Sequence, residues 1–455
     1  MATLPQPHLF SWTQIDAASD LDRLVLVLSA LPDERLVRYL EKLRANGRDD
    51  YPVRATWNLL LAGIVYQHPS AASLLREARR NPQLRQVCGF DPCLGDLAVP
   101  TDDAFGRLLQ NVIEAQDKLV DVFNGLVREL ARELPDLGKH LAADSKALAS
   151  HGRPVRDPEK RDDPDGRRDT DADWGCKTYK GQRSDGTTWE KVKYWFGYKL
   201  HLIVDSVYEM PLAFKLTKAS TGDSPELLPL VGQMLKRQPT IATQKRKELS
   251  ADKAYDSEEN NRQLYETHHI LSVIDKRTLW REETTQPLYD QRVEPFIYDE
   301  HGHVYCVDSV TGERREMYFA GFEQDRDSLR YRCPAAANGF ACKSREECDA
   351  NHCRSNFGRV VRVPLAKDWR IFTPIARHTQ KWKTAYNRRS AVERVNSRID
   401  RVLGFEEHFI RGHAKMETRV TLGLVVMLAM ALGRIRANQR DRMRSLTAPV
   451  RRLAA

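Results

Sequence analysis

Apolar residues recur every three or four positions through most of residues 20–135, which is the spacing of one face of an α-helix. The pattern breaks at Leu31-Pro32 and again at Gly47, and Thr101 offers a capping side chain before the last stretch. We therefore expect an all-α N-terminal domain at residues 1–135. Its predicted helices cover residues 20–31, 36–47, 56–66, 71–81 and 104–134.

From residue 136 onward the pattern changes to short runs of branched and aromatic residues, which are typical of β-strands. Strands are predicted at 141–148, 194–205, 211–216, 248–252 and 270–275. Helices are predicted at 224–236 and 257–268, between the last three strands, while the polar stretch 152–173 predicts a long loop. This order of elements predicts a mixed α/β sheet with helices on its faces, in which residues 136–275 form the first part of the core.

The remaining chain divides into three parts. Residues 276–370 contain short β-like pieces between charged turns and predict a β-rich insertion, and residues 371–440 return to helical spacing at 384–402 and 414–439. The apolar run 422–432 is too short to span a membrane, so we expect a buried helix there. Residues 441–455 form a basic tail.

Positive charge is concentrated near the C-terminal end. The whole chain has a formal net charge of +9, whereas residues 376–401 and 434–455 each carry +6. Such segments are typical of proteins that bind nucleic-acid backbones, although a solvated basic helix face gives the same pattern. Eight cysteines in 455 residues and an N-terminus without the pattern of a signal peptide favour a reducing, cytoplasmic location.

Three acidic residues stand out by their context. Asp144 and Asp252 each come near the end of a predicted strand, and Glu393 lies within a strongly basic helix. Such acids can converge at one edge of a sheet, where divalent cations would offset the repulsion between like charges. The alternative, that they are ordinary strand-end and surface acids, has the same sequence pattern.

The helix around Glu393 also carries Tyr386 and Arg389 in the pattern Y-x-x-R-x-x-x-E. On one helix these three side chains would project from nearly the same face. The pattern resembles the motif of the third catalytic acid in bacterial insertion-sequence transposases of the DDE type.

Other segments resemble the same family. Ala143-Asp144-Ser-Lys and Ala251-Asp252-Lys-Ala-Tyr are similar to its first and second acidic motifs, and Gly222-Asp223-Ser is similar to a segment between them. The motifs occur in the family's order, with a β-rich insertion before the third. The sequence departs from the family at Asp400, seven residues after Glu393, where members often have a lysine.

The resemblance implies a ribonuclease-H-like α/β fold in which Asp144, Asp252 and Glu393 bind two Mg²⁺ (or Mn²⁺) ions. It implies a transposase that binds the terminal inverted repeats of its element, cleaves DNA strands and joins them to target DNA. The expected partners are double-stranded DNA and a second copy of the chain on that DNA, at the bacterial nucleoid and without a membrane. We expect the N-terminal helices to bind DNA ends. The expected contacts to DNA backbone are Tyr386, Arg389, Arg398, Arg401 and Lys253.

Two other functions remain open from the sequence. A domesticated relative would recognise specific DNA without cutting it, and a host nuclease built on the same core would cut without needing specific ends. Metal-dependent cleavage separates the first from a transposase, and competition by unrelated DNA separates the second.

A group of cysteines lies inside the predicted insertion. Four thiols within 21 residues could hold one tetrahedral Zn²⁺, with Cys306 and His352 nearby. The spacing lacks the C-x2-C pair of regular zinc ribbons, so free thiols are the alternative. The four candidate ligands are Cys333, Cys342, Cys348 and Cys353.

Overall fold

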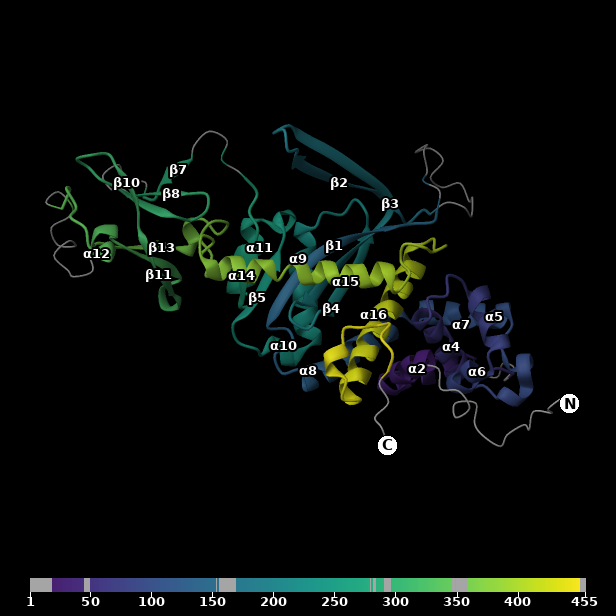
Figure 1. The fold of residues 1–455 in the computed structure, drawn as a ribbon. Helices are drawn as coiled ribbons and strands as arrows, with labels where there is room; N and C mark the ends of the chain where they lie inside the picture. Colours follow the sequence, from purple (N-terminus) through teal and green to yellow (C-terminus); the bar gives the residue numbers. More distant parts are fainter. Residues whose placement is uncertain are drawn as a thin grey trace.

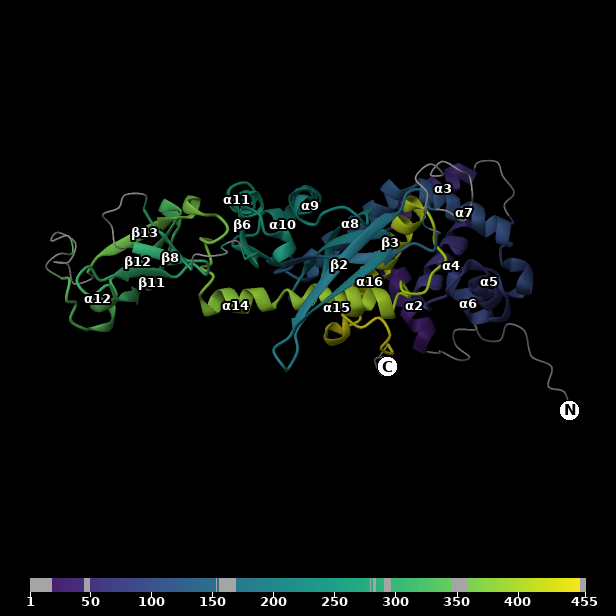
Figure 2. The same ribbon diagram turned by 90° about the horizontal axis from the view of Figure 1, so that it is seen from above.

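The computed structural model shows an elongated molecule with helices at one end, a mixed sheet in the centre and a small β-rich module at the other end (Figures 1 and 2). It describes residues 19–44, 50–152, 154, 169–278, 280, 284–289, 296–345, 348 and 358–450.

The N-terminal end is helical, as the spacing of apolar residues predicted. The predicted helix over 104–134 is two helices, however, because Ala115 leaves helical geometry at φ −92° and ψ 27°. Thr101 caps the first of the two by accepting a hydrogen bond from the backbone N–H of Ala104 at 3.2 Å. The elements are α2 (Ser19–Ala30), α3 (Glu34–Arg44), α4 (Val53–Val65), α5 (Ala71–Arg80), α6 (Pro82–Cys88), η1 (Pro92–Ala98), α7 (Asp102–Glu114) and α8 (Gln116–Glu133).

The central sheet is mixed. Its main part has the strand order β4-β3-β1-β5-β6, in which β1, β5 and β6 are parallel and β3 runs antiparallel to both of its neighbours. The predicted mixed α/β architecture is therefore confirmed. The strands are β1 (His140–Ala149), β3 (Thr188–Asp205), β4 (Met210–Lys218), β5 (Lys247–Ala251) and β6 (Ile270–Ile274), and the helices between them are α9 (Ser224–Arg237), α10 (Pro239–Ala242) and α11 (Glu258–Glu266).

One strand of this sheet was not predicted. Strand β2 (Asp173–Gln182) pairs with the first half of β3, and the two strands form a ribbon that projects beyond the rest of the sheet (Figures 1 and 2). Most of the ribbon is exposed on both faces, so it lacks the alternation of buried and exposed positions by which strands are recognised.

The β-rich module contains the short strands predicted for residues 276–370, arranged in two small sheets with a separate apolar core around Tyr331 and Phe372. The first sheet consists of β7 (Thr285–Pro287), β8 (Phe296–Asp299), β9 (Val304–Val307) and β10 (Arg314–Glu316). The second consists of β11 (Tyr318–Glu323), β12 (Ser328–Arg332) and β13 (Val360–Pro364), with η4 (Gln324–Arg326), α12 (Pro334–Asn338) and η5 (Leu365–Lys367) beside it.

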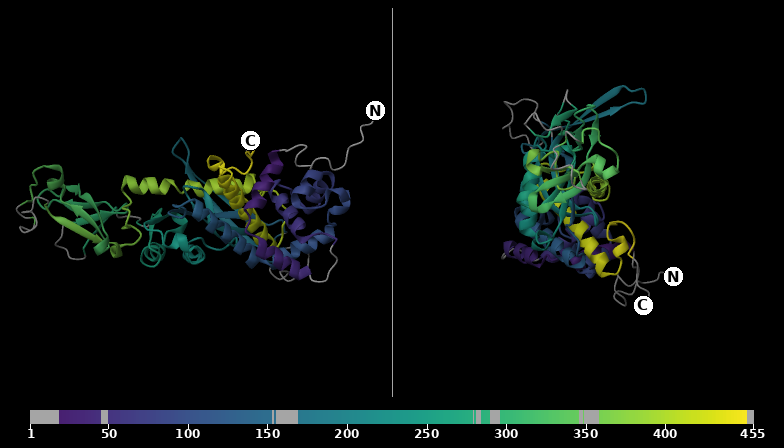
Figure 3. Two further views of the ribbon diagram at one scale, coloured as in Figure 1. Left: turned by 90° about the horizontal axis from the view of Figure 1, so that it is seen from below. Right: turned by 90° about the vertical axis from the view of Figure 1, so that its left-hand side faces the viewer.

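The chain then returns along the sheet through α14 (Gln380–Asn387) and α15 (Ser390–Arg401), and ends in α16 (His413–Arg436) and η6 (Arg440–Arg442). The prediction of one helix over 384–402 is wrong, because the structure has two helices there, separated between Asn387 and Ser390. Figure 3 shows from two further sides how these yellow-green helices join the β-rich module to the sheet.

Helix α16 is the centre of the core. It is long and apolar enough to cross a membrane by length and composition, but 89% of its apolar window is buried inside the protein, which confirms the predicted buried helix. It packs against α8, α2 and α4 on one side and β4 on the other. One continuous apolar core consequently joins the N-terminal helices to the sheet, and the sequence boundary predicted at residue 135 does not interrupt it.

Candidate active site

Two of the predicted acids lie side by side at the end of a parallel strand pair. The β1/β5 pairing runs to Ala143 opposite Ala251, and the next residue of each strand is Asp144 or Asp252. Paired strands are about 4.8 Å apart, so the two carboxylates start from neighbouring backbone positions. The sequence predicted Asp144 near the end of its strand. In the structure Asp144 lies in the middle of β1, because this strand continues to Ala149, where it pairs with β3 alone.

Local hydrogen bonds hold both carboxylates. The Asp144 Oδ1 accepts from the backbone N–H of Ser145 at 2.8 Å, and the Asp252 Oδ1 accepts from that of Ala254 at 2.8 Å, which caps the short helix η3 (Lys253–Tyr255). Burial and, to a lesser extent, the charge of Asp252 raise the pKa of Asp144 to about 6. The site thus holds negative charge that the protein does not fully neutralise.

A third aspartate belongs to this cluster. The phenol of Tyr255 is buried, and burial together with the charges of Asp223, Asp144 and Asp252 holds its pKa well above the usual range. Asp223 lies just before α9 and pairs with Lys199 at 3.1 Å. The sequence marked Asp223 only as part of a motif between the two acids and gave no sign of the role of Tyr255.

Glu393 lies on α15, which packs on β1 and β3, but among the described residues it does not join the two aspartates in a group of three that could hold a metal ion. Its Oε1 lies 2.7 Å from Arg389 Nη2, and its side chain is 55% exposed. Burial lowers the pKa of Arg389, but the charges of Glu393 and Asp144 raise it by more, so this guanidinium lies near both the helix acid and the strand acid. The motif residues therefore remain neighbours although a helix break separates Tyr386 from Glu393.

Tyr386 completes the motif. Its ring stacks on Trp382 with centroids 4.9 Å apart and planes 9° apart, and the Arg389 guanidinium lies 5.9 Å from its centroid. Burial raises the pKa of Tyr386, and the charges of Asp275 and Asp252 contribute. The stacked pair thus borders the acidic cluster on the side of β5 and β6.

The other basic residues predicted to contact DNA differ in availability. Lys253 and Arg401 are exposed, and no described carboxylate pairs with either. Arg398 instead donates to the backbone oxygen and the carboxylate of Glu209 at 2.9 and 3.0 Å, and to the backbone oxygen of Arg444 at 3.0 Å. Its DNA contact stays a prediction, and the guanidinium would have to leave these partners to make it.

Asp400, the departure from the resembled motif, forms an ion pair with Lys146 of β1. Both side chains are mostly buried, with 20% and 13% of their surface exposed. Since Lys146 follows Asp144 by two positions on the strand, the cation on this face comes from β1 rather than from α15.

The cysteines predicted as zinc ligands lie in the β-rich module. Burial raises the pKa of Cys306 on β9 to about 11, and the nearby thiols of Cys333, Cys348 and Cys342 contribute, so these four are close in space. Cys353 lies outside the described residues. Among the described residues, no three His, Cys, Asp or Glu side chains form an arrangement ready to hold a metal ion, so the zinc site stays a prediction.

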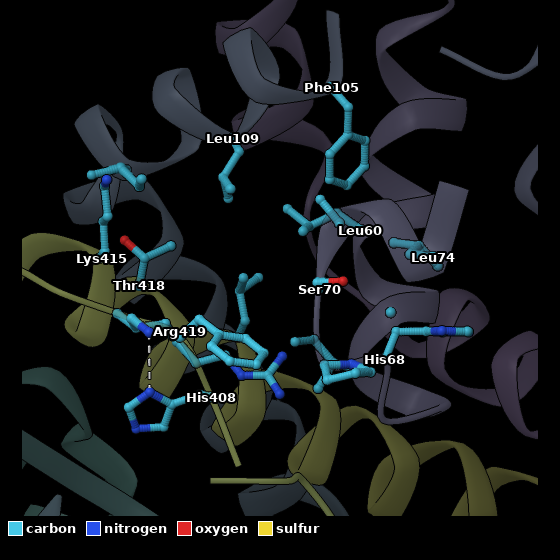
Figure 4. Close-up of a pocket in the computed structure, with 18 residues that line it drawn as sticks. Leu60, His68, Ser70, Leu74, Phe105, Leu109, His408, Lys415, Thr418 and Arg419 are labelled. Atoms are coloured by element: carbon cyan, nitrogen blue, oxygen red, sulfur yellow. Dashed lines mark hydrogen bonds between the residues drawn. The ribbon is translucent and has the colours of Figure 1, made fainter. Parts of the chain in front are cut away.

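A cavity of about 260 Å³ lies elsewhere, between the N-terminal helices and α16 (Figure 4). Leu60, Leu74, Phe105 and Leu109 form its apolar wall, while the basic side chains opposite include Arg419. No carboxylate is among the described residues that line it, and Asp144 and Asp252 are not part of its wall.

Comparison with known proteins identifies the family. Residues 136–429 match the family model described as Transposase DDE domain. The chain belongs to this family of transposases. In the DDE transposase, the matched region begins just before β1 and ends inside α16, so it includes all three predicted acids and the β-rich module.

The other comparisons add less. No curated protein matches the sequence of this DDE transposase at a significant level. One solved structure, the piggyBac transposase synaptic complex with hairpin DNA, is similar over 94% of this chain and 79% of that chain, at 11% identity and a TM-score of 0.36. A score this low does not establish a shared fold.

Proposed function

We propose that the protein is an active DNA transposase that binds the terminal inverted repeats of its element, cleaves strands there and joins them to target DNA. The observation that carries the proposal is the adjacency of Asp144 and Asp252 at the end of paired strands, with Arg389 close enough to both Asp144 and Glu393 to feel their charges. The strand order β4-β3-β1-β5-β6, with β3 antiparallel, supports a ribonuclease-H-like core.

The donor chemistry of Asp144, Asp252 and Glu393 fits a divalent metal, which would have to draw the Glu393 carboxylate toward the two aspartates. All three groups are carboxylates, the oxygen ligands that Mg²⁺ and Mn²⁺ prefer. Burial and the charge of Asp252 raise the pKa of Asp144, and a bound cation would favour the ionised form of this carboxylate. We propose that Asp144, Asp252 and Glu393 hold two such ions, which would stabilise charge on the scissile phosphate and activate the attacking hydroxyl.

The chain's own residues would position DNA around this site. Arg389 pairs with Glu393 at 2.7 Å, which restrains the orientation of the helix acid. We propose that Tyr386, Arg389, Lys253 and Arg401 contact the backbone near the cut, because they border the cluster or are exposed beside it. Hydrolysis and strand transfer differ only in the attacking group, which is water in the first and the 3′ hydroxyl of the cut DNA in the second. One site can therefore perform both.

Transposition requires two ends to be brought together, so we propose that a homodimer forms on DNA and that the N-terminal helices read the ends. The alternative is a domesticated relative that binds these ends without cutting. The presence of an acid at all three motif positions favours the active enzyme.

The proposal is tested with a labelled duplex that carries the element's own end. The wild type should cleave it with Mg²⁺ and not with EDTA, whereas Glu393→Gln should bind the duplex equally and not cleave it. Glu406→Gln, a change in an exposed acid just beyond α15, is the matched control and should cleave normally. Binding without cleavage by the wild type would favour the domesticated relative, and equal cleavage by Glu393→Gln would refute the assigned site.

A further inference from the structure

The ribbon formed by β2 and β3 has two chemically different faces. In an antiparallel pair, residues directly opposite each other project from the same face. Lys177 pairs with Lys193, Tyr179 with Lys191, Gly181 with Trp189 and Gly175 with Trp195. We call these side chains the lysine–aromatic face; it consists of Lys177, Lys191, Lys193, Tyr179, Trp189 and Trp195.

The two glycines show how the tryptophans lie. A Cβ added to Gly175 would overlap the ring of Trp195, and one added to Gly181 would overlap the ring of Trp189. Each indole therefore lies against the backbone of the neighbouring strand, where a larger residue would exclude it. The other side of the Trp189 ring remains accessible, since 38% of this residue is exposed.

The lysines of this face are available for a partner. Lys177, Lys191 and Lys193 are all exposed, and no described carboxylate forms an ion pair with any of them. Glu190 is opposite Lys180 in the register and so belongs to the other face, while Asp173, at the base of the ribbon, accepts a hydrogen bond from Ser220 at 2.8 Å. The face thus carries three lysines without an ion-pair partner among the described carboxylates.

The face also leads to the acidic cluster. Burial is the main cause of the raised pKa of Asp144, but the charge of Lys177 acts in the opposite direction, which places this lysine near the site. From Trp195 to Trp189 the ribbon extends about 20 Å, at about 3.3 Å per residue. This is the length of roughly six nucleotides of one DNA strand.

We propose that the lysine–aromatic face binds the DNA strand that leads to the acidic cluster, with the lysines on phosphates and the exposed aromatic rings on bases unpaired near the cut. Alternating cations and aromatic rings are typical of surfaces that bind single-stranded DNA. The positive charge and the position beside the cluster favour DNA over a second copy of the chain. This inference rests on the proposed function and adds a surface to it.

The test measures binding of a duplex with a single-stranded flank at its end, across a series of salt concentrations. In the triple variant Lys177→Ala/Lys191→Ala/Lys193→Ala, the slope of log K (the binding constant) against log salt concentration should become less negative by about 2–3. Trp189→Ala should bind the flanked duplex roughly 5- to 150-fold more weakly and the blunt duplex nearly as well as the wild type does.

Two control variants make the test specific. Tyr194→Ala removes an exposed ring from the opposite face of the same ribbon and should bind normally. Lys236→Ala/Lys245→Ala/Lys343→Ala removes three exposed lysines elsewhere and should change the salt dependence less.

Equal effects in both lysine variants, or unchanged binding in the ribbon variants, would overturn the proposal. Loss of a dimer with unchanged DNA binding would also overturn it and would identify the face as a contact between copies. If the wild type cleaves specifically and the ribbon variants bind and cleave as well as it does, the proposal for the lysine–aromatic face is wrong and the proposed function stands. Wild-type protein that neither binds nor cleaves the DNA would refute the proposed function with it.

Discussion

Replacing Asp144 with asparagine should stabilise the metal-free protein. The pKa of Asp144 is raised from 3.8 to about 6, mainly by burial and then by the charge of Asp252. A shift of about two pKa units corresponds to about 3 kcal/mol, the upper value by which the ionised carboxylate destabilises the folded state. Asparagine has nearly the same shape and carries no charge, so it removes this cost.

The effect should depend on pH with a definite sign. A raised folded-state pKa means that the folded protein binds the proton more tightly than the unfolded chain does. The wild type therefore loses stability as the pH rises from about 4 to about 6, and the loss is complete above that range. The advantage of Asp144→Asn should be largest at pH 8, roughly half as large at pH 5, about a fifth as large at pH 4, and absent near pH 3.

The assay is denaturation of both proteins in EDTA at these pH values, followed by the same series with Mg²⁺. Mg²⁺ should stabilise the wild type and have little effect on Asp144→Asn, because the variant lacks one proposed ligand. Asp400→Asn is the control with opposite sign, since it breaks the mostly buried pair with Lys146 and should lower stability by roughly 1–3 kcal/mol. An Asp144→Asn variant no more stable than the wild type at pH 8 would refute the reasoning.

Three further predictions concern the fold. Glu209→Gln should destabilise the protein by roughly 2–4 kcal/mol, because this buried carboxylate pairs with Arg394, Arg398 and Arg444; an unchanged denaturation midpoint would contradict it. Gly433→Ala should lower the melting temperature, since its Cβ would lie 2.6 Å from the Leu26 backbone oxygen and separate α16 from α2. Trp57→Phe should cost roughly 1–3 kcal/mol in chemical denaturation, because the buried indole N–H donates to Asp33 at 2.6 Å; Trp57→Phe with wild-type stability would show that this bond contributes little.

The parts of the fold with a buried face could be predicted from sequence. The strands that carry Asp144 and Asp252, the hairpin of β3 and β4, and the buried helix α16 all have apolar patterns imposed by the core. Strand β2 could not be predicted, because its side chains are mostly exposed and its glycines accommodate Trp195 and Trp189 rather than a core. The helix breaks at Ala115 and after Asn387 were not predicted, because the apolar spacing continues through both.

The candidate site divides in the same way. The motif pattern identified Asp144, Asp252 and Glu393, and the register of β1 and β5 explains why the first two are adjacent. Sequence did not show that Tyr255 lies among three aspartates, because that depends on how η3 turns after β5. Nor did it show that Arg398 is bound to Glu209, a residue 189 positions earlier in the chain.

The central claim, that acids from β1, β5 and α15 form one metal site, is tested most directly by replacing Mg²⁺ with Fe²⁺ and mapping where the iron cuts the polypeptide on addition of ascorbate and peroxide. The account predicts cuts near residues 144, 252 and 393, which excess Mg²⁺ suppresses and Asp252→Asn abolishes. Cuts confined to other segments, or the same three cuts in Asp252→Asn, would contradict it.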